Sequence, residues 1–172
     1  MNPIFTKILS DSSKITIEIA TEVVGNNPDF FKKVLDLSLK PKSPLNIRAA
    51  RVVVAAAENY YHLFLPYINR VVKRFPNFKT DGQKRAFAYL LSKYIDYMRE
   101  DKHVEMLDVC FRYMFEDENI AVKYNCMIFL YETAKIYPEL KGELKHAIDF
   151  NLTQNIFKMN GEVKEIYKEI SQ

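Results

Sequence analysis

The segment Asn119–Leu144, NIAVKYNCMIFLYETAKIYPELKGEL, decides the fold of this chain. Asn119 is suited to cap a helix, because its side-chain oxygen can accept a hydrogen bond from a free backbone N–H of the first turn. Pro138 cannot continue that helix, because it lacks an N–H and its ring disfavours a helical conformation of the residue before it. The segment therefore predicts a helix over residues 119–137, a proline stop, and a second helix that opens at Glu139.

The helix predicted over residues 119–137 is apolar on two sides. One face carries residues spaced three or four apart, namely Cys126, Met127, Leu130, Ala134 and Tyr137. The opposite face carries Ile128, Phe129 and Ile136. A helix that is apolar on both sides packs against neighbours on both sides. Such a helix, followed by a short turn into another, is what a stacked array of helices requires.

The same helix pair recurs along the chain. Further helices are predicted over residues 2–9, 14–24, 28–39, 45–57, 62–75, 82–98, 101–115, 139–151 and 161–170. The second helix of each pair begins near residue 14, 45, 82, 119 or 161, at spacings of 31, 37, 37 and 42 residues. A repeat of about 35–45 residues is typical of a solenoid. We expect an all-α superhelix of about five antiparallel helix pairs; the alternative is a compact helical bundle.

The expected pairs cover the chain as a single domain over residues 1–172, which is the natural size for one domain. The pairs are predicted over residues 2–24, 28–58, 62–99, 101–137 and 139–170. Within the third pair, Pro66 lies near the start of the first helix and can move its first turn to the proline itself. Asp81 is the predicted cap of the helix that follows over residues 82–98.

Composition and charge bound the class of protein. The net charge of +3 is too small to indicate nucleic-acid binding by itself. Cys110 and Cys126 lie in apolar helical stretches, which predicts buried free thiols rather than a disulfide scaffold or a zinc site. The first residues lack the layout of a signal peptide, and the longest apolar run, Val52–Ala57, is far shorter than the ~20 residues that span a bilayer. We expect a soluble cytoplasmic protein that does not insert into a membrane.

Three segments resemble the second helices of HEAT repeats: Ile47–Ala55 (IRAARVVVA), Lys84–Leu91 (KRAFAYLL) and Val122–Leu130 (VKYNCMIFL). The likeness extends over about residues 28–144. The resemblance implies a right-handed α–α superhelix whose second helices line a concave face, and a scaffold or binding function without enzymatic activity or a cofactor. A minority of HEAT-like proteins resemble alkylpurine DNA glycosylases or act on bilin chromophores, which keeps a DNA-repair-like function as an alternative.

Cations and aromatic residues early in the second helices are the candidate contacts for a protein partner. The residues singled out are Arg48, Arg51, Arg85, Tyr89, Lys123 and Tyr124. Arginine and aromatic side chains are favoured at binding hot spots. A structural alternative exists for the cations, because a positive charge near a helix N-terminus opposes the helix dipole unless an acid neutralises it. Asp81 before Arg85, and Asp117 or Glu118 before Lys123, are placed to form such a ladder.

The middle of the chain is its most basic part. Residues 70–102 hold nine Lys or Arg against four Asp or Glu, whereas residues 103–172 hold eight against twelve. A basic stretch with Tyr89, Tyr94 and Tyr97 for base stacking is compatible with a nucleic-acid surface. Tyrosines at helical spacing also pack at the edge of a core, and charge runs are usually solvated faces. Nucleic-acid binding is therefore the second hypothesis, after protein binding.

No motif in the chain indicates catalysis, a metal or a cofactor. The four glycines never cluster, so no phosphate-binding loop is present, and no nucleophile motif can be read from the spacing. His62, His103 and His146 follow no metal-ligand spacing, and the first two are expected to be exposed near turns. We assign no catalytic, metal or cofactor residue.

Self-association is the third hypothesis. The first predicted helix places Ile4, Phe5 and Ile8 on one side. A solenoid has two ends whose apolar faces need cover, so an apolar end is able to pair two chains. The sequence thus leaves a homodimer through one end of the repeat array as an open possibility.

Overall fold

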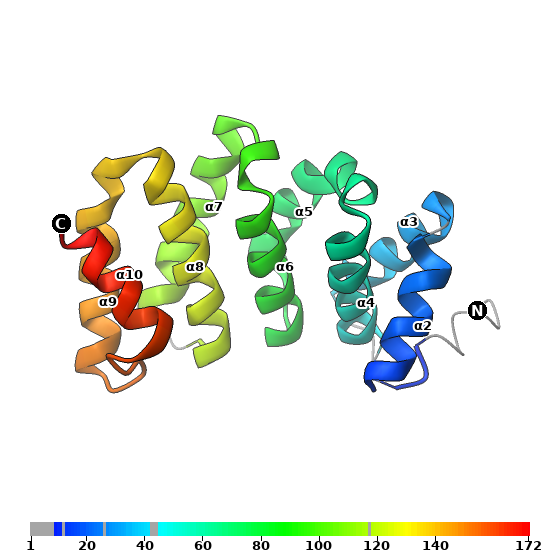
Figure 1. Ribbon diagram of the computed structural model, residues 1–172, viewed down its shortest axis with the longest axis horizontal. Coiled ribbons are helices and arrows are strands. Elements are labelled where there is room, and N and C mark those ends of the chain that lie inside the picture. The colour runs from blue at the N-terminus through cyan, green and yellow to red at the C-terminus, as the bar shows by residue number, and fades with distance from the viewer. Residues whose placement is uncertain (1–8, 12, 26, 42–44, 117) are drawn as a thin grey trace. The chain divides into compact units, whose positions relative to one another are not determined.

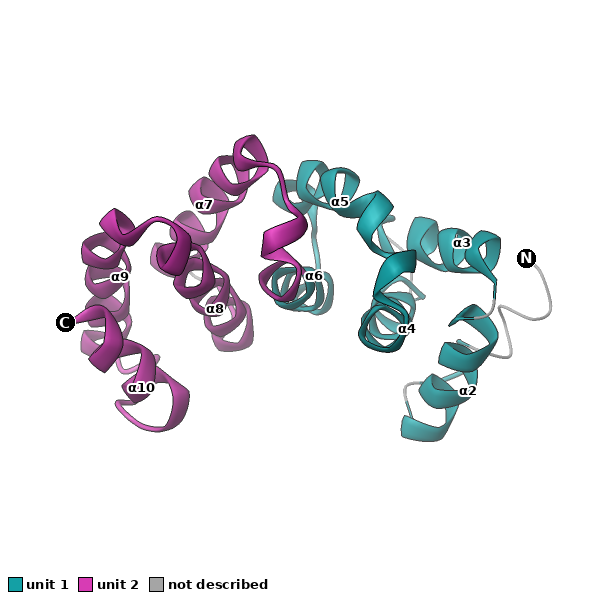
Figure 2. Ribbon diagram, turned by 45° about the horizontal axis from the view of Figure 1, so that its top comes forward, with its two compact units in different colours: residues 1–90 teal, residues 91–172 magenta. Residues whose placement is uncertain are grey.

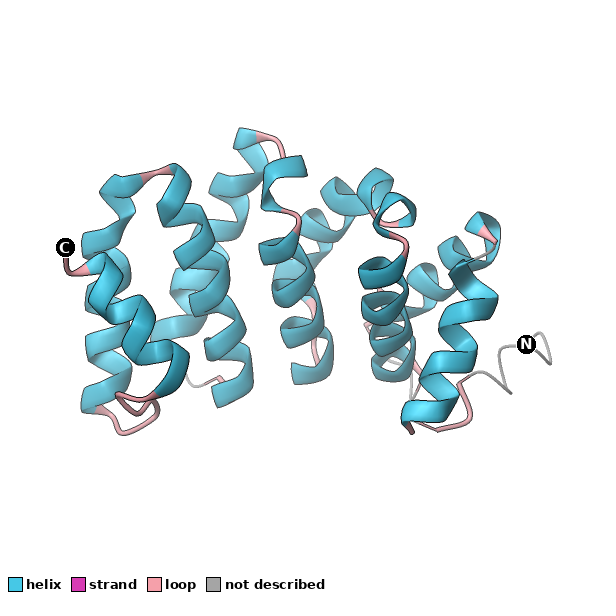
Figure 3. Cartoon of the chain, viewed as in Figure 1, coloured by secondary structure: helices cyan, strands magenta, loops and turns pink. Residues whose placement is uncertain are grey.

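Helices are the regular structure of the chain in its computed structural model, which describes residues 9–11, 13–25, 27–41, 45–116 and 118–172 (Figure 1). The α-helices of these ranges are α2 (Lys14–Gly25), α3 (Pro28–Ser38), α4 (Asn46–Asn59), α5 (Ile68–Arg74), α6 (Asp81–Lys93), α7 (Glu100–Phe115), α8 (Ile120–Ile136), α9 (Lys141–Thr153) and α10 (Gly161–Ile170). Short 3-10 turns join several of them, and the described ranges contain no strand (Figure 3). The predicted all-α fold is confirmed. The helix predicted over residues 2–9 lies outside the described residues.

The chain divides into two compact units, residues 1–90 and residues 91–172, with the boundary inside α6. In unit 1, α3 and α5 form the first layer, and α2, α4 and α6 form the second (Figure 2). In unit 2, α7 and α9 form the first layer, and α8 and α10 form the second (Figure 2). Each pair therefore contributes its first helix to one layer and its second helix to the other, as a helical repeat requires.

The helix predicted over residues 119–137 forms as expected. The side chain of Asn119 accepts a hydrogen bond from the Ala121 N–H at 2.9 Å, and the helix ends at Ile136, before Pro138. Its two-sided packing is also present, because Met127 on one face and Phe129 on the other are both buried. The proline then starts a 3-10 turn over Pro138–Leu140 that leads into α9.

The helix predicted over residues 62–75 is broken into shorter pieces. Two 3-10 turns, Tyr61–Leu63 and Leu65–Tyr67, precede α5, and a third, Phe75–Asn77, follows it. Pro66 and Pro76 cause the interruptions, because a proline inside a helix removes a hydrogen bond and its ring clashes with the preceding turn. The α-helical part of this pair therefore begins only at Ile68.

The start and the end of α6 also differ from the prediction. Thr80, and not Asp81, caps this helix, since Thr80 Oγ1 accepts the Gln83 N–H at 3.3 Å and Asp81 already lies in the first turn. The end comes at Lys93 rather than Met98, and a 3-10 turn over Ile95–Tyr97 follows. Residues 80–83 have the Thr-x-x-Gln spacing of a capping box. This pattern in the sequence indicates Thr80 as the cap of α6.

Two glycines permit close helix contacts in unit 1. A Cβ atom on Gly82 of α6 would lie 2.7 Å from Ile47 Cγ2 of α4, so the second-layer helices approach closely at this point. A Cβ atom on Gly25, at the end of α2, would lie 2.0 Å from Tyr60 Cε2. Both distances are far below van der Waals contact, and a larger residue at either position would separate the elements.

Candidate functional site

The six candidate residues belong to two separate units. Arg48 and Arg51 lie on α4, and Arg85 and Tyr89 lie on α6, all within unit 1. Lys123 and Tyr124 lie on α8, within unit 2. Each of the six lies on a second-layer helix of its own unit, but their side chains have different surroundings. They are therefore considered unit by unit.

Arg48 holds the backbone that precedes α2. Its Nη1 donates to the Leu9 carbonyl at 2.9 Å and to the Ser10 carbonyl at 2.6 Å, and the side chain is half-buried. The guanidinium is thus hydrogen-bonded to backbone carbonyls. The ladder hypothesis expected an acidic side chain as its partner instead. Arg48 has a structural role in unit 1, which leaves its guanidinium little capacity for a partner.

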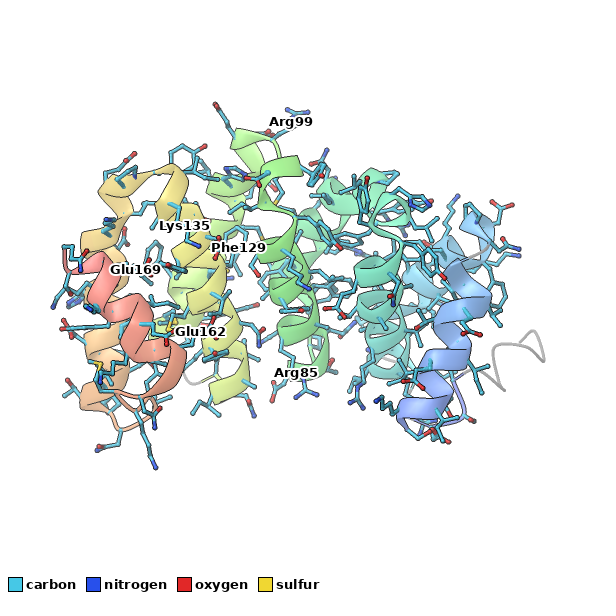
Figure 4. The ribbon with its side chains drawn as sticks, in the orientation of Figure 1. Arg85, Arg99, Phe129, Lys135, Glu162 and Glu169 are labelled. Carbon is cyan, nitrogen blue, oxygen red and sulfur yellow. The ribbon has the colours of Figure 1, made fainter. Side chains whose placement is uncertain are left out.

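Arg51 and Arg85 are exposed on neighbouring second-layer helices of unit 1. Their helices, α4 and α6, touch at the Gly82–Ile47 contact, and Ile47 itself is 36% exposed. Arg85 lies near the N-terminal end of α6 (Figure 4), and it forms no hydrogen bond or ion pair with any residue in the described ranges. The expected pairing of Arg85 with an acid of a neighbouring repeat is therefore absent from the described part of the chain.

Tyr89 links the same two helices farther along. Its hydroxyl donates to Glu58 Oε1 of α4 at 2.5 Å, and the ring is half-buried. The bond fixes the ring orientation, and the Glu58 carboxylate keeps its negative charge beside the ring. Arg51, Arg85, Ile47 and Tyr89 together define the α4–α6 face, a name kept below.

Lys123 is buried, and the expectation that it contacts a partner is wrong. Only 1% of the residue is exposed, and its Nζ donates to the Met114 carbonyl of α7 at 2.8 Å. Asn151 of α9 donates to the same carbonyl at 2.9 Å. The Met114 carbonyl belongs to the last turn of α7, where carbonyls lack partners inside the helix and a cation is favoured by the helix dipole. Lys123 therefore closes the end of a helix.

Unit 1 closes the end of α3 with a related arrangement that the sequence analysis missed. Gln83 of α6 is fully buried, and its Nε2 donates to the Ser38 carbonyl at 2.7 Å and to the Lys40 carbonyl at 2.9 Å. Asn46 of α4 also donates to the Lys40 carbonyl, at 3.0 Å. A lone Gln gives no sign of such a contact in a sequence, because the acceptors of Gln83 are backbone atoms 45 and 43 residues away.

Tyrosine–glutamate pairs join α8 to α10 in unit 2. The Tyr124 hydroxyl donates to Glu162, and the Tyr131 hydroxyl, two helical turns later, donates to Glu169. Glu162 and Glu169 face α8 from α10 (Figure 4). Partial burial, and then the bond to the glutamate and its charge, raise the pKa of Tyr124 and of Tyr131 to about 12. Tyr124 thus has a structural partner within unit 2.

The basic stretch over residues 70–102 falls into both units. Fourteen of the 25 Lys and Arg and seven of the 22 Asp and Glu lie in residues 1–90, which leaves eleven and fifteen for residues 91–172. The formal net charge is therefore +7 for unit 1 and −4 for unit 2. Arg70 is paired with Asp36 at 2.5 Å, whereas the exposed Lys73, Arg74 and Lys79 have no ion pair in the described ranges.

In unit 2, the cations of the basic stretch are mostly paired. Arg99 bonds Asp101 at 2.9 Å, and Lys102 pairs with both Asp101 and Glu105. These local pairs lie on the surface and are screened by solvent. The excess positive charge of the stretch therefore belongs to unit 1.

His103 is buried, contrary to the expectation that it is exposed. Its Nδ1 lies 3.2 Å from the Tyr137 hydroxyl and its Nε2 lies 3.1 Å from the Ile95 carbonyl, so both ring nitrogens have partners. His62 is exposed, as expected. Within the described ranges, no group of three or more His, Cys, Asp or Glu is arranged to hold a metal ion. Among those same residues, no helix has the length and apolarity needed to cross a membrane.

Cys110 and Cys126 are free thiols on α7 and α8, and both are buried. Burial raises the pKa of the Cys110 thiol, and contact with Cys126 raises it further. Two of the pockets lined by described residues are open to solvent. One of about 430 Å³ lies in unit 2 and is lined by residues that include Tyr131, Lys135 and Glu169, and one of about 230 Å³ lies in unit 1 between α2 and α4. Neither contains a nucleophile paired with a base.

Comparison with known proteins identifies the repeat. A family model described as a HEAT repeat domain matches residues 6–170, which is nearly the whole chain. No curated protein and no solved structure matches it.

Proposed function

Because the chain belongs to the HEAT repeat family, we propose that it is a non-enzymatic protein-binding scaffold, and that its α4–α6 face binds an acidic segment of a partner protein. The single observation that carries the proposal is Arg85, an exposed guanidinium with no ion pair in the described ranges, on the unit whose net charge is +7. A strongly basic surface selects acidic partners and accelerates their association.

The composition of the face supports a protein partner. Arg51 and Arg85 supply planar donors that can hold carboxylates in a bidentate manner. Ile47 and Tyr89 add apolar and aromatic area beside them, and the Tyr89 ring is held in place by its bond to Glu58. Arginine with aromatic neighbours is the typical composition of a binding hot spot. The second-layer position matches the expectation from the family resemblance, in which second helices carry the binding surface.

Arg48, Lys123 and Tyr124 are left out of the proposed site. Arg48 and Lys123 bind backbone carbonyls, and Tyr124 is paired with Glu162 in the other unit. Of the six original candidates, Arg51, Arg85 and Tyr89 remain, and they come from adjoining helices of one unit. A reducing cytoplasmic setting is part of the proposal, and it is supported by the two buried free thiols.

The test is a binding titration with charge-reversed variants. The probe is a fluorescent glutamate-rich peptide that also carries leucine and phenylalanine, titrated by anisotropy with the full chain. Arg51→Glu with Arg85→Glu is expected to weaken binding by about 100-fold, because each lost guanidinium–carboxylate contact costs about 1.5 kcal/mol. Lys32→Glu is the matched control for the single variant Arg85→Glu, since Lys32 is exposed on α3 of the same unit and the change in net charge is equal.

Equal weakening by Lys32→Glu and by Arg85→Glu would show that the peptide senses only the net charge of unit 1, and would overturn the proposed face. Affinity purification from the native host, followed by mass spectrometry, then identifies the natural partner. Loss of an acidic partner from the Arg51→Glu/Arg85→Glu bait, with retention on the Lys32→Glu bait, is the expected result.

Nucleic-acid binding is the second candidate function, and a different observation favours it. Lys73, Arg74 and Lys79 are exposed, and none forms an ion pair in the described part of the chain. Lys73 and Arg74 lie in α5, and Lys79 lies between the 3-10 turn Phe75–Asn77 and α6. Electrophoretic shift assays at low salt test this candidate directly, because the electrostatic contribution to binding is strongest there. Absence of a shift at micromolar protein excludes it, whereas a shift that Lys73→Glu/Arg74→Glu abolishes supports it.

A further inference from the structure

The larger of the two pockets described above lies in unit 2, where the ends of α8 and α10 meet the start of α9. Its volume of about 430 Å³ is within the range of sites that hold small organic molecules. Lys135 of α8 and Glu169 of α10 both line it, and they lie at neighbouring helix ends (Figure 4). Three helices and the 3-10 turn Pro138–Leu140 form this site, which we call the α8–α10 pocket.

The most buried residues that line the α8–α10 pocket are apolar. Ala134 is 2% exposed and Ile170 is 6% exposed. The exposed ring of Pro138 and the half-buried ring of Tyr131 add further apolar area. The Tyr131 ring is held in one orientation, because its hydroxyl donates to Glu169. Such a lining suits the apolar contacts of an aromatic group.

Lys141 adds an ammonium group without an acceptor to this lining. The residue is the first of α9 and is half-buried, and its side chain forms no hydrogen bond or ion pair with any residue in the described ranges. The other buried or half-buried lysines of unit 2 have acceptors: Lys102 and Lys145 pair with nearby acids, and Lys123 bonds a backbone carbonyl. A partly desolvated ammonium that lacks an acceptor is costly, which favours an anionic ligand from outside the chain.

The other charged groups of the lining are already engaged. Lys135 Nζ lies 2.8 Å from Glu132 Oε1 and 4.2 Å from the centre of the Tyr131 ring. Glu169 accepts the Tyr131 hydroxyl but keeps its negative charge. The described lining contains no arginine, so it lacks the planar donors that favour bidentate contact with a phosphate. A single ammonium beside apolar surface therefore suits a singly charged carboxylate.

We propose that the α8–α10 pocket binds an aromatic carboxylate, with the ring on the apolar lining and the carboxylate on Lys141. A ligand of about 13 non-hydrogen atoms is expected to bind with a dissociation constant on the order of 100 µM. The pocket lies within unit 2, whereas the α4–α6 face lies within unit 1. The proposed site thus stands independently of the proposed function.

The test is a titration of naphthoate, which is fluorescent, with the full chain up to about 1 mM, followed by anisotropy. Naphthamide, its neutral match, is expected to bind about 10-fold more weakly, because it cannot form the charged contact. Lys141→Ala is expected to weaken naphthoate by about 10-fold and to leave naphthamide unchanged. Lys158→Ala is the matched control, since Lys158 is exposed between α9 and α10, does not line the pocket and carries the same charge.

A second variant is expected to act in the opposite direction. Glu169→Gln removes the negative charge from the lining and retains an acceptor for the Tyr131 hydroxyl. It is expected to strengthen naphthoate binding by about 3-fold and to leave naphthamide unchanged. Helical circular dichroism of each variant confirms that it is folded.

Three results would each overturn the proposal. The first is no binding of naphthoate up to about 1 mM protein, because the expected affinity is measurable there. The second is equal binding of naphthoate and naphthamide, which would show that no cation reads the carboxylate. The third is equal weakening by Lys141→Ala and Lys158→Ala, which would show that the ligand senses only the net charge of unit 2.

A competition experiment distinguishes the two sources of such a carboxylate. Phenylpropanoate represents a free small molecule, and a short peptide that ends in phenylalanine with a free carboxylate represents the end of a protein chain. Both are titrated against bound naphthoate. Stronger displacement by phenylpropanoate assigns the pocket to a metabolite, stronger displacement by the peptide assigns it to a chain end, and displacement by neither overturns the proposed ligand class.

Discussion

Unit 1 and unit 2 both close the C-terminal end of a first-layer helix with buried polar side chains, but they use different chemistry. Unit 1 uses two neutral amides, Gln83 and Asn46, on the carbonyls of Ser38, the last residue of α3, and of Lys40, just beyond it. Unit 2 uses the ammonium of Lys123 together with the amide of Asn151 on the last turn of α7. In both units, the donors come from two different helices, so the polar contact also fixes how adjacent repeats pack.

The difference indicates which buried polar group contributes most to the stability of each unit. A buried amide costs little once it is hydrogen-bonded, whereas a buried ammonium also has a large desolvation cost that its partners must offset. Lys123 meets that cost with a short bond to a carbonyl at the negative end of a helix. The two units also differ in charge, +7 against −4, and only unit 1 has a candidate partner surface with an unpaired arginine within the described residues.

Removal of Lys123 is expected to have the largest effect. Lys123→Ala deletes a long buried side chain and its charged hydrogen bond, so we expect a loss of about 3–4 kcal/mol in the free energy of unfolding. Lys123→Met keeps most of the volume, and Asn151 still donates to the Met114 carbonyl. Its loss should be about half as large. Urea denaturation measures both, and a loss below about 1 kcal/mol for Lys123→Ala would show that the ammonium contributes little net stability.

Removal of Gln83 tests the neutral counterpart in unit 1. Gln83→Ala leaves the Ser38 carbonyl without its donor, while the Lys40 carbonyl keeps Asn46. We expect a loss of about 2–3 kcal/mol, smaller than for Lys123→Ala, because no charge is involved. The same urea measurements decide the order. If Gln83→Ala proves the more damaging of the two, the contrast between charged and neutral closures is incorrect.

Two glycines, one in a helix of each unit, allow the tightness of helix packing in the two units to be compared. Gly82 and Gly142 are both the second residue of their helices, but a Cβ on Gly82 meets Ile47 at 2.7 Å and a Cβ on Gly142 meets nothing within 4 Å. Gly82→Ala is therefore expected to destabilise by about 1 kcal/mol, since overpacking outweighs the gain in helix propensity. Gly142→Ala is expected to stabilise by about 0.5 kcal/mol.

Thermal unfolding of both alanine variants measures the contrast. Ile47→Ala combined with Gly82→Ala should recover part of the loss that Gly82→Ala causes, relative to Ile47→Ala alone, because the clash is removed. Equal melting temperatures for Gly82→Ala and Gly142→Ala would mean that α4 and α6 are not in close contact at Ile47.

The tyrosine pairs of unit 2 give the smallest predicted effect, and it appears only at alkaline pH. The pKa of Tyr124 and of Tyr131 is raised to about 12 in the folded chain, against about 10 for an unfolded tyrosine. Below pH 10 both states keep the proton, and the stabilisation is intact. Between pH 10 and pH 12 the unfolded chain ionises first, so the free energy of unfolding falls as pH rises.

Absorbance titration of tyrosinate checks this behaviour. Tyr124→Phe and Tyr131→Phe should each remove one tyrosine from the group that ionises near pH 12, a group that also contains Tyr113. A decrease in the fraction that ionises near pH 10 instead would contradict the assignment to α8–α10 pairs.

Much of the fold was readable from local patterns. The helix from Asn119 to the proline stop, the repeat of helix pairs and the family resemblance all follow from residues close together in the chain, where capping and helical periodicity act. The break of the helix predicted over residues 62–75 was only partly foreseen, because Pro66 was recognised as a possible start and Pro76 as a stop. The actual α-helix retains only seven residues.

The sequence by itself determined the all-α repeat, its approximate period and the positions of its strongest caps. Only the tertiary structure decided which cations are exposed, since Arg48 and Lys123 bind carbonyls from other segments whereas Arg85 remains at the surface. The physical reason is that an inner helix such as α8 is apolar on both sides, so its sequence has no single polar face from which exposure can be read. The acceptors that capture its buried polar groups are backbone atoms, which every residue carries and no sequence pattern identifies.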